Sequence, residues 1–327
     1  MNTQTIPRNP FKEIPIVIAY KLLICVADFL EDVFWARNKR ELEPESKEAS
    51  EVDLWDDATI LDKFYGAVRA GQGLPESVDG FSELKIYKIS ESIVVKQAMG
   101  RTFDSPVQVP HEALALEFVR KHTSIPVPRI HRILHTETEP GTHLYVMDFI
   151  EGDQLGQVWP TLLPQWGKLR IAWTLRSYIR QLRRAKSTLS SVPGPLGDEP
   201  QTCIGFIFQG KRRVSFPDLP SLSSWFHAGV RATRERFGLP PSRRDPFRKC
   251  QKMVLTHMDL NMRNILVGKD GRIWAIDWDW AGFYPEWFEY MNLSFVSMMS
   301  TPISSQRCIP FITDPYVECI RWMQATD

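Results

Sequence analysis

A short β-hairpin with polar residues at both open ends constrains the fold more than any other part of this 327-residue sequence. Residues 265–267 (ILV) form a β run, residues 268–271 (GKDG) a turn and residues 272–276 a second β run. A hairpin brings the residue before its first strand close to the residue after its second strand, and here these are Asn264 and Asp277. An amide oxygen and a carboxylate at one place form a hard donor set of the kind that binds Mg²⁺.

A second acid precedes the hairpin. Asp259 lies in the loop that enters it and would point another carboxylate into the same space. Such groups beside a metal ion fit phosphoryl transfer, in which Mg²⁺ neutralises phosphate charge while a carboxylate takes or orients the proton of the attacking hydroxyl. The spacing His257-x-Asp259-x₄-Asn264 matches the catalytic loop of kinases, with Asp277 in the place of their metal-binding aspartate.

Composition limits the classes of protein to which the chain can belong. Hydrophobic residues make up 43% and charged residues 24% of the sequence, which is typical of globular proteins with a sizeable core. The net charge of +1 excludes an overall basic field for nucleic acid. Five cysteines without a C-x-x-C pair, and no H-E-x-x-H, disfavour a disulfide scaffold or a zinc enzyme. We therefore expect a reducing compartment, the cytoplasm.

Residues 14–35 are the most apolar part of the N-terminal region. Lys21 interrupts this stretch early, whereas a spanning helix needs about 18 or more apolar residues without charge. We therefore predict no clear transmembrane segment but a helix packed on the body of the protein, with a helix at the membrane surface or a signal anchor as the alternative. Residues 38–53 are dense in charge and predict a solvated linker. The charges of Arg183 and Arg184 are likewise interpreted as solvated.

The order of the remaining elements predicts an α+β protein with two lobes. The periodicity of apolar residues predicts helices over 54–70, 111–122, 169–185 and 222–237, a hairpin over 84–96 and a strand over 142–150. A strand gives way to a turn near Glu151, which we take as the boundary between the lobes. The predicted units are residues 1–53 (helix and charged linker), 54–150 (N-terminal lobe) and 151–327 (C-terminal lobe).

Three segments then give the chain a family resemblance. The segment THMDLNMRNILV (256–267), followed by AIDWDWAGFYPEWFEY (275–290), resembles the aminoglycoside phosphotransferase and choline kinase branch of the protein-kinase-like superfold. FVRKHTSIPVPRIHRI (118–133) and LYVMDFIEGDQLGQVWP (144–160) agree with it. The resemblance covers roughly residues 75–295 and is greatest to fungal members. It implies a bilobal protein-kinase-like fold with a small β-rich N-terminal lobe and a larger, mostly helical C-terminal lobe.

The resemblance implies that the N-terminal lobe binds ATP. Lys96, at the end of a β run, would hold the α- and β-phosphates, and Glu112 at the start of the next helix would orient that lysine. Glu117 is the rival partner, since the two glutamates face different sides of one helix and only one of them can reach the lysine. The backbone of the hinge, from Met147 to Phe149, would meet the adenine.

The same resemblance assigns the chemistry to the C-terminal lobe. Asp259 would receive or orient the proton of the acceptor hydroxyl, and Asn264 and Asp277 would hold Mg²⁺. His257 would brace the catalytic loop by hydrogen bonds rather than act as a base. The aromatic cluster that starts at Trp278 is interpreted as packing of the lobe, with stacking on a substrate as the alternative.

The sequence departs from the family pattern near the phosphates and in the catalytic loop. Where a glycine-rich loop is expected, VDGFSELKIYKI (78–89) contains Gly80 alone, so a close approach of backbone to phosphate is harder. Met258 replaces a glycine that is often found between the histidine and the aspartate. Asn261 stands where serine/threonine protein kinases carry lysine, and no A-P-E element follows Asp277. A protein substrate is therefore less expected than a small molecule.

These observations predict an ATP- and Mg²⁺-dependent kinase that phosphorylates a hydroxyl of a small molecule. Two alternatives remain: a pseudokinase or nucleotide-binding module, supported by the glycine-poor loop, and an atypical protein kinase. The sequence leaves the acceptor and the oligomeric state open.

Overall fold

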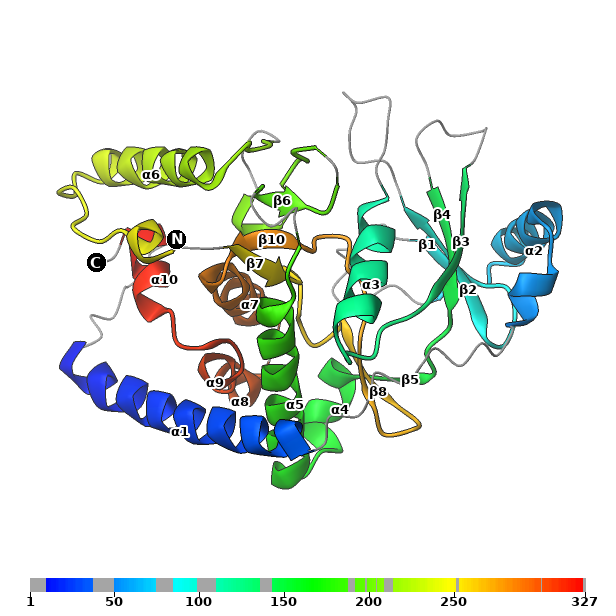
Figure 1. The fold of residues 1–327 in the computed structure, drawn as a ribbon, viewed down its shortest axis with the longest axis horizontal. Coiled ribbons are helices and arrows are strands. Elements are labelled where there is room, and N and C mark those ends of the chain that lie inside the picture. Colours follow the sequence, from blue (N-terminus) through cyan, green and yellow to red (C-terminus); the bar gives the residue numbers. More distant parts are fainter. Residues whose placement is uncertain are drawn as a thin grey trace.

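The computed structural model consists of a sheet-based lobe and a helix-rich lobe (Figure 1). It describes residues 10–37, 50–74, 85–98, 110–135, 143–187, 192–197, 199–203, 205–208, 214–250, 253–300 and 302–325. Gly80 and most of the predicted charged linker lie outside the described residues.

The N-terminal lobe contains a four-stranded antiparallel sheet in the order β1-β2-β4-β3. Its strands are β1 (Lys85–Lys88), β2 (Ile93–Ala98), β3 (Ile130–His135) and β4 (His143–Asp148), and β1 and β2 form the predicted hairpin. Successive side chains of a strand point to opposite faces. Ile93 and Val95 of β2 therefore pack with α2 (Asp57–Arg69), whereas Val94 packs with α3 (His111–His122). Lys96 follows the register of Val94 and lies on the α3 face.

The start of α2 differs from the prediction. The helix begins at Asp57 rather than at residue 54, because the Asp56 side chain accepts a hydrogen bond from the Thr59 amide (2.8 Å) and caps the first turn. The preceding residues form a 3₁₀ turn, η1 (Glu51–Leu54), whose Val52 is 1% exposed and packs in the N-terminal lobe. The C-terminal end of the predicted linker is therefore packed rather than solvated.

Two small sheets lie in the C-terminal lobe, in the orders β5-β8-β9 and β6-β10-β7. Their strands are β5 (Gly152–Gln154), β6 (Gly194–Pro195), β7 (Met253–Thr256), β8 (Ile265–Gly268), β9 (Ile273–Ala275) and β10 (Gly282–Pro285). The predicted hairpin is β8 and β9, and β5 extends it after the chain leaves the N-terminal lobe. In the second sheet, a Cβ on Gly282 would lie 2.2 Å from the Gly194 carbonyl oxygen, so this pairing requires glycine.

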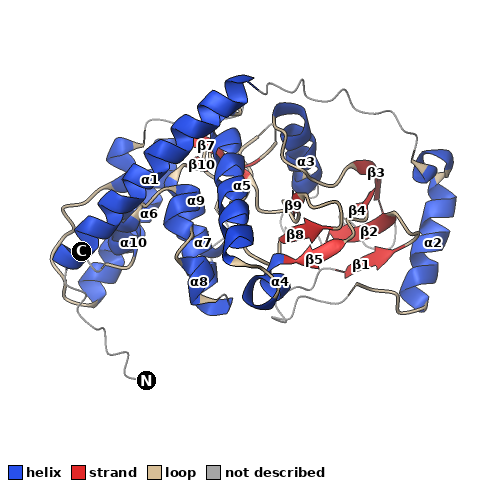
Figure 2. Cartoon of the chain, turned by 90° about the horizontal axis from the view of Figure 1, so that it is seen from below, coloured by secondary structure: helices blue, strands red, loops and turns tan. Residues whose placement is uncertain are grey.

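Helices form most of the rest of the C-terminal lobe (Figure 2). They are α4 (Leu155–Thr161), α5 (Gln165–Arg184), α6 (Leu219–Arg236), α7 (Trp287–Ser300), α8 (Ile303–Gln306), α9 (Ile309–Thr313) and α10 (Val317–Met323), with 3₁₀ turns η3 (Phe206–Phe208) and η4 (Pro246–Lys249). Helices α5 and α6 are the two predicted ones, each beginning a few residues earlier than the periodicity indicated.

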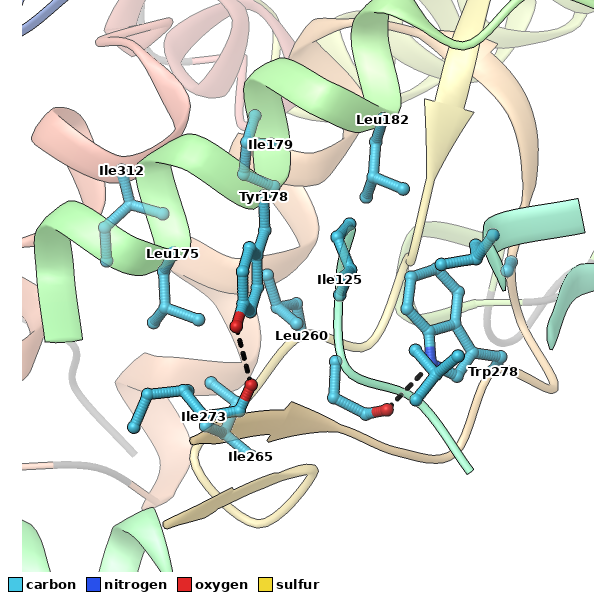
Figure 3. Packing of buried hydrophobic residues seen from close by; sticks show 14 of the residues in the cluster. Ile125, Leu175, Tyr178, Ile179, Leu182, Leu260, Ile265, Ile273, Trp278 and Ile312 are labelled. Atoms are coloured by element: carbon cyan, nitrogen blue, oxygen red, sulfur yellow. Dashed lines mark hydrogen bonds between the residues drawn. The ribbon is translucent and has the colours of Figure 1, made fainter. Parts of the chain in front are cut away.

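Helix α5 packs its apolar face against the hairpin (Figure 3). Leu175 and Ile179 belong to the same buried cluster as Ile265 and Ile273 of the two hairpin strands. The hydroxyl of Tyr178 donates to the Ile273 carbonyl (2.7 Å), which ties the helix to the second strand. The core thus fixes the position of the ribbon that carries the polar residues.

The N-terminal helix α1 (Pro10–Arg37) packs along the outer side of the C-terminal lobe, against α5 and α9, as predicted. Ile24 and Ala27 are buried in the main core, and no helix in the described ranges is long and apolar enough to cross a membrane. The prediction of solvated charge is wrong for Arg183, which is largely buried and contacts Asp314. Arg184 is half exposed and bonds to Asp32 of α1 (2.9 Å).

Candidate active site

Lys96 links the two lobes. Its ammonium nitrogen lies 2.6 Å from Glu112 Oε2 on α3 and 2.7 Å from Asp277 Oδ1, beyond the end of β9. Lys96 and Glu112 are 3% and 2% exposed, so this cluster is almost dry on the N-terminal side. The structure thus pairs the lysine with Glu112, and Glu117 is exposed to solvent.

The negative charges of neighbouring carboxylates keep Lys96 protonated. Burial alone would lower the pKa of its ammonium group, but the carboxylates of Asp277 and Glu112 outweigh burial and raise this pKa above the ordinary value. The charge of Asp279 acts in the same direction. A fixed positive charge at the junction of the lobes is suited to an anionic ligand.

The hairpin brings its two polar ends together as its geometry predicts. The amide of Ile276 donates to the carbonyl of Asn264 (3.0 Å), so the ladder continues beyond β9 to the residue before Asp277. Asp277 itself has a φ of +63°, a conformation that non-glycine residues rarely adopt. Its side chain is 27% exposed, so it is accessible to a ligand while it pairs with Lys96.

Amide groups hold the carboxylate of Asp259. The Asn261 amide donates to Oδ1 (2.8 Å) and the Asn264 amide donates to Oδ2 (2.7 Å), and Asp259 is 5% exposed. Burial, followed by the charge of Asp277, raises the pKa of Asp259 to about 7, although these bonds and Arg263 oppose the shift. A carboxyl group with such a pKa can exchange a proton near neutral pH.

His257 connects the loop that carries Asp259 with the segment that carries Asp277. Its Nδ1 accepts from the Asp259 amide (3.2 Å), which leaves Nε2–H to donate to the Ile276 carbonyl (3.1 Å). Burial lowers the pKa of His257 to about 4, so the ring is neutral at physiological pH. These contacts hold the two segments together.

Two residues of α7 that the sequence analysis did not identify anchor the same loop. Glu289 Oε2 accepts from the amides of His257 (2.6 Å) and Met258 (3.3 Å), and the Asn292 amide donates to the Met258 carbonyl. Both side chains are 1% exposed, and Met258 has a φ of +65°. The family's frequent glycine at this position has a physical reason here, since glycine adopts a positive φ without strain. A glutamate and an asparagine among the aromatic and apolar residues of the first two turns of α7 were the available sequence signal.

Residues of the predicted hinge pack and form hydrogen bonds within the N-terminal lobe. Met147 packs on the α3 face beside Val94, the face that also carries Lys96. The amide of Phe149 donates to the Ser92 carbonyl (2.7 Å), and the amide of Asp148 donates to the Arg129 carbonyl. In this conformation, therefore, the amides of these two residues donate to carbonyl groups of the N-terminal lobe.

The donor set for a metal ion is small but chemically suitable. Within the described ranges, no three His, Cys, Asp or Glu side chains gather as a metal site. Because the Asn264 amide nitrogen is turned to Asp259, its oxygen and the Asp277 carboxylate are the candidate ligands. Mg²⁺ commonly binds with one or two protein oxygens and takes its remaining ligands from phosphate and water.

The aromatic residues after Asp277 form the interior of the lobe. Trp278 is 1% exposed, and its indole N–H donates to the Ala275 carbonyl (3.0 Å; Figure 3). Phe283, Tyr284, Trp287 and Phe288 are also buried. The packing interpretation is confirmed for these residues.

Comparisons with known proteins identify the family of the chain. A family model described as the phosphotransferase enzyme family, APH, matches residues 78–305. A search of curated protein sequences finds no match. Among solved structures, the chain is similar to a mutant of aminoglycoside 2′-phosphotransferase-IIIa in complex with GDP, with 13% identity over 80% of this chain and 85% of that chain and a TM-score of 0.51.

Two further structures show similar coverage. The complex of gentamicin with APH(2″)-IIa has 12% identity over 83% of this chain and 86% of that chain, with a TM-score of 0.50. Choline kinase LicA from Streptococcus pneumoniae has 13% identity over 82% and 85%, with a TM-score of 0.43. The chain has the bilobal kinase-like fold, and because the family model matches more than half of its length, it belongs to the APH phosphotransferase enzyme family.

Proposed function

We propose that this protein transfers the terminal phosphoryl group of ATP, in the presence of Mg²⁺, to a hydroxyl of a small molecule. The observation that carries the proposal is the position of Lys96, within 2.7 Å of both Glu112 and Asp277. This lysine joins a nucleotide-binding lobe (residues 54–150) to a catalytic lobe (residues 151–327). A buried cation at this junction, with an ion-binding acid beside it, matches the needs of phosphoryl transfer.

Lys96 contacts the nucleotide phosphates in this proposal. Glu112 holds the lysine from α3, and the raised pKa of Lys96 keeps its charge at physiological pH. The ion pair with Asp277 also fixes the separation of the lobes where the phosphates would lie. Met147, on the same face of the sheet, lines the adenine side.

Asn264 and Asp277 hold the magnesium ion in this proposal. When bound, Mg²⁺ neutralises charge on the phosphates and orients them for in-line transfer. Asn264 is held for this role by its hydrogen bonds to Asp259.

Asp259 takes or orients the proton of the acceptor hydroxyl. Both of its oxygens accept hydrogen bonds from asparagine amides, which fixes the plane of the carboxylate without neutralising it. The acceptor oxygen attacks the terminal phosphorus, the bond to the ADP oxygen breaks, and the hydroxyl proton leaves through Asp259. His257 and Glu289 hold the loop that carries this acid.

The test measures formation of ADP or GDP, and of a phosphorylated product, from ATP or GTP with a panel of sugars and amino alcohols. We compare the wild type with Asp259→Asn and with Asp153→Asn, a matched change at an exposed position of β5. Loss of a general base lowers turnover by about 10²–10⁴-fold, so Asp259→Asn falls by that factor while nucleotide affinity stays within about twofold. Asp153→Asn retains wild-type turnover.

Three results would overturn parts of this proposal. Equal turnover by the wild type and Asp259→Asn removes the assigned role of this acid. Nucleotide binding without turnover on any acceptor identifies a binding module in place of an enzyme. Labelled phosphate that passes to protein but to no small molecule identifies a protein kinase.

A further inference from the structure

Helix α1 carries a stripe of exposed apolar side chains that its packing on the lobe does not use. We call this the α1 stripe; its side chains are 37–67% exposed, and it consists of Ile18, Leu22, Leu23, Val26, Phe29, Leu30 and Val33. Successive members are one, three or four residues apart, and together they lie on one side of the helix over about 22 Å of its length. A helix that is apolar on two sides is normally buried on both.

Three acidic side chains in the described part of α1, those of Asp28, Glu31 and Asp32, point away from the stripe and are paired. Arg176 binds both oxygens of Asp28 (2.7 and 2.8 Å), and Arg180 binds Glu31 (2.7 Å) and Asp32 (2.9 Å). These pairs fix α1 on α5 and neutralise its negative charge. Lys21 is exposed on the same side of the helix as Asp32, which Arg180 and Arg184 bind (2.9 Å each). The outer surface of the helix is therefore apolar, and the charges beside it are either paired or basic.

The shape and area of the stripe favour a deformable partner. Its side chains present on the order of 600 Å² of apolar surface, the upper end of what monomeric proteins expose. A stable protein interface buries about 800 Å² on each partner. A flat, rigid partner would contact only the outermost side chains of this convex helix, whereas lipid chains can pack around all of them. The helix is also an outermost element of the C-terminal lobe (Figures 1 and 2).

We propose that α1 lies in the surface of a phospholipid bilayer, with the α1 stripe in the acyl boundary and Lys21 at the headgroups. Binding through such a helix scales with buried apolar area and with attraction of basic residues to anionic lipid. The ion pairs with α5 hold the C-terminal lobe against the membrane by the face that carries α1. This inference does not depend on the proposed reaction.

Sedimentation with phosphatidylcholine vesicles containing about 30 mol% phosphatidylserine tests the proposal. The probe variant is Leu22→Asp with Phe29→Asp, both on the stripe. The matched control is Leu54→Asp with Leu162→Asp, at apolar positions that are 84% and 71% exposed elsewhere. We expect the wild type and the control to bind the vesicles, and the probe variant to bind at least about tenfold more weakly. Circular dichroism verifies that each variant is folded.

Cys25, which is exposed beside the stripe, provides a second measurement without a charged substitution. An environment-sensitive fluorophore on Cys25, with Cys250 and Cys308 changed to serine, shifts its emission to the blue when vesicles are added. The proposal would be overturned if the wild type does not bind the vesicles or if both double variants bind them equally well. It would also be overturned if the emission of the fluorophore does not shift. A dimer that only the stripe variant dissociates identifies a second copy as the occupant and also refutes it.

Discussion

The buried carboxyl group of Glu289 permits a quantitative test of how the catalytic loop is held. Glu289 is 1% exposed, and burial raises its pKa from 4.5 to about 7, against the opposing amides of Met258 and His257. The folded protein therefore keeps this proton over a pH range in which the unfolded chain releases it. The associated stability is complete below pH 4.5 and is lost as the pH rises to about 7. The interval between the two pKa values corresponds to about 3 kcal/mol.

Glu289→Gln removes the titration and keeps an oxygen acceptor for the two amides. Weaker hydrogen bonds cost this variant about 1–2 kcal/mol, independently of pH. Between pH 4.5 and about 7.5, however, the wild type loses about 3 kcal/mol of unfolding free energy that the variant retains. The variant is therefore less stable than the wild type in acid and equally or more stable above neutral pH.

Urea unfolding, followed by tryptophan fluorescence at a series of pH values, measures this difference. The matched control is Glu91→Gln, because Glu91 is exposed and its neutralisation relieves no burial. The free energy of unfolding of the control should follow that of the wild type at every pH. If the unfolding free energies of the wild type and Glu289→Gln change in parallel with pH, the argument is refuted. That result would mean that α7 holds the loop without burying a titrating acid.

Two further substitutions test the site and the sheet beside it. Lys96→Met leaves the Glu112 carboxylate buried and unpaired, so urea unfolding should show a loss of about 3–5 kcal/mol, part of which Glu112→Gln in the same chain restores. Gly282→Ala forces a Cβ to 2.2 Å from the Gly194 oxygen and should lower stability by at least about 3 kcal/mol. Gly66→Ala in α2, where a Cβ meets nothing within 4 Å, should instead raise stability by about 0.5–1 kcal/mol; equal effects of the two glycine substitutions would contradict the steric argument.

The sequence was sufficient to predict the features that follow from local geometry. A hairpin necessarily brings Asn264 near Asp277, and the two-residue period of β2 places Lys96 on the face opposite to Ile93 and Val95. Glu112 could be favoured but not separated from Glu117 by sequence alone. The choice between them depends on how α3 is rotated against the sheet, where Ala113 packs with Val94 and Tyr145.

Features that depend on distant parts of the chain were not predictable in this way. Glu289 and Asn292 contact a loop about 30 residues earlier in the sequence, and their role follows from where α7 lies under that loop. The engaged amide of Phe149 depends on the turn between β1 and β2, whose Ser92 carbonyl reaches it. In each case the hydrogen-bonding group was evident from the sequence, but its partner was set by tertiary packing.

The backbone of the site is strained at two residues, and one neutral histidine connects them. Met258 and Asp277 both have a positive φ, which costs on the order of 1–3 kcal/mol for each non-glycine residue. His257 precedes Met258 and bonds to the carbonyl of Ile276, which precedes Asp277. Its other ring nitrogen must be unprotonated to accept from the Asp259 amide, and the lowered pKa ensures this. Burial keeps His257 uncharged, and the uncharged ring can therefore bond both to the loop of Asp259 and to the segment of Asp277.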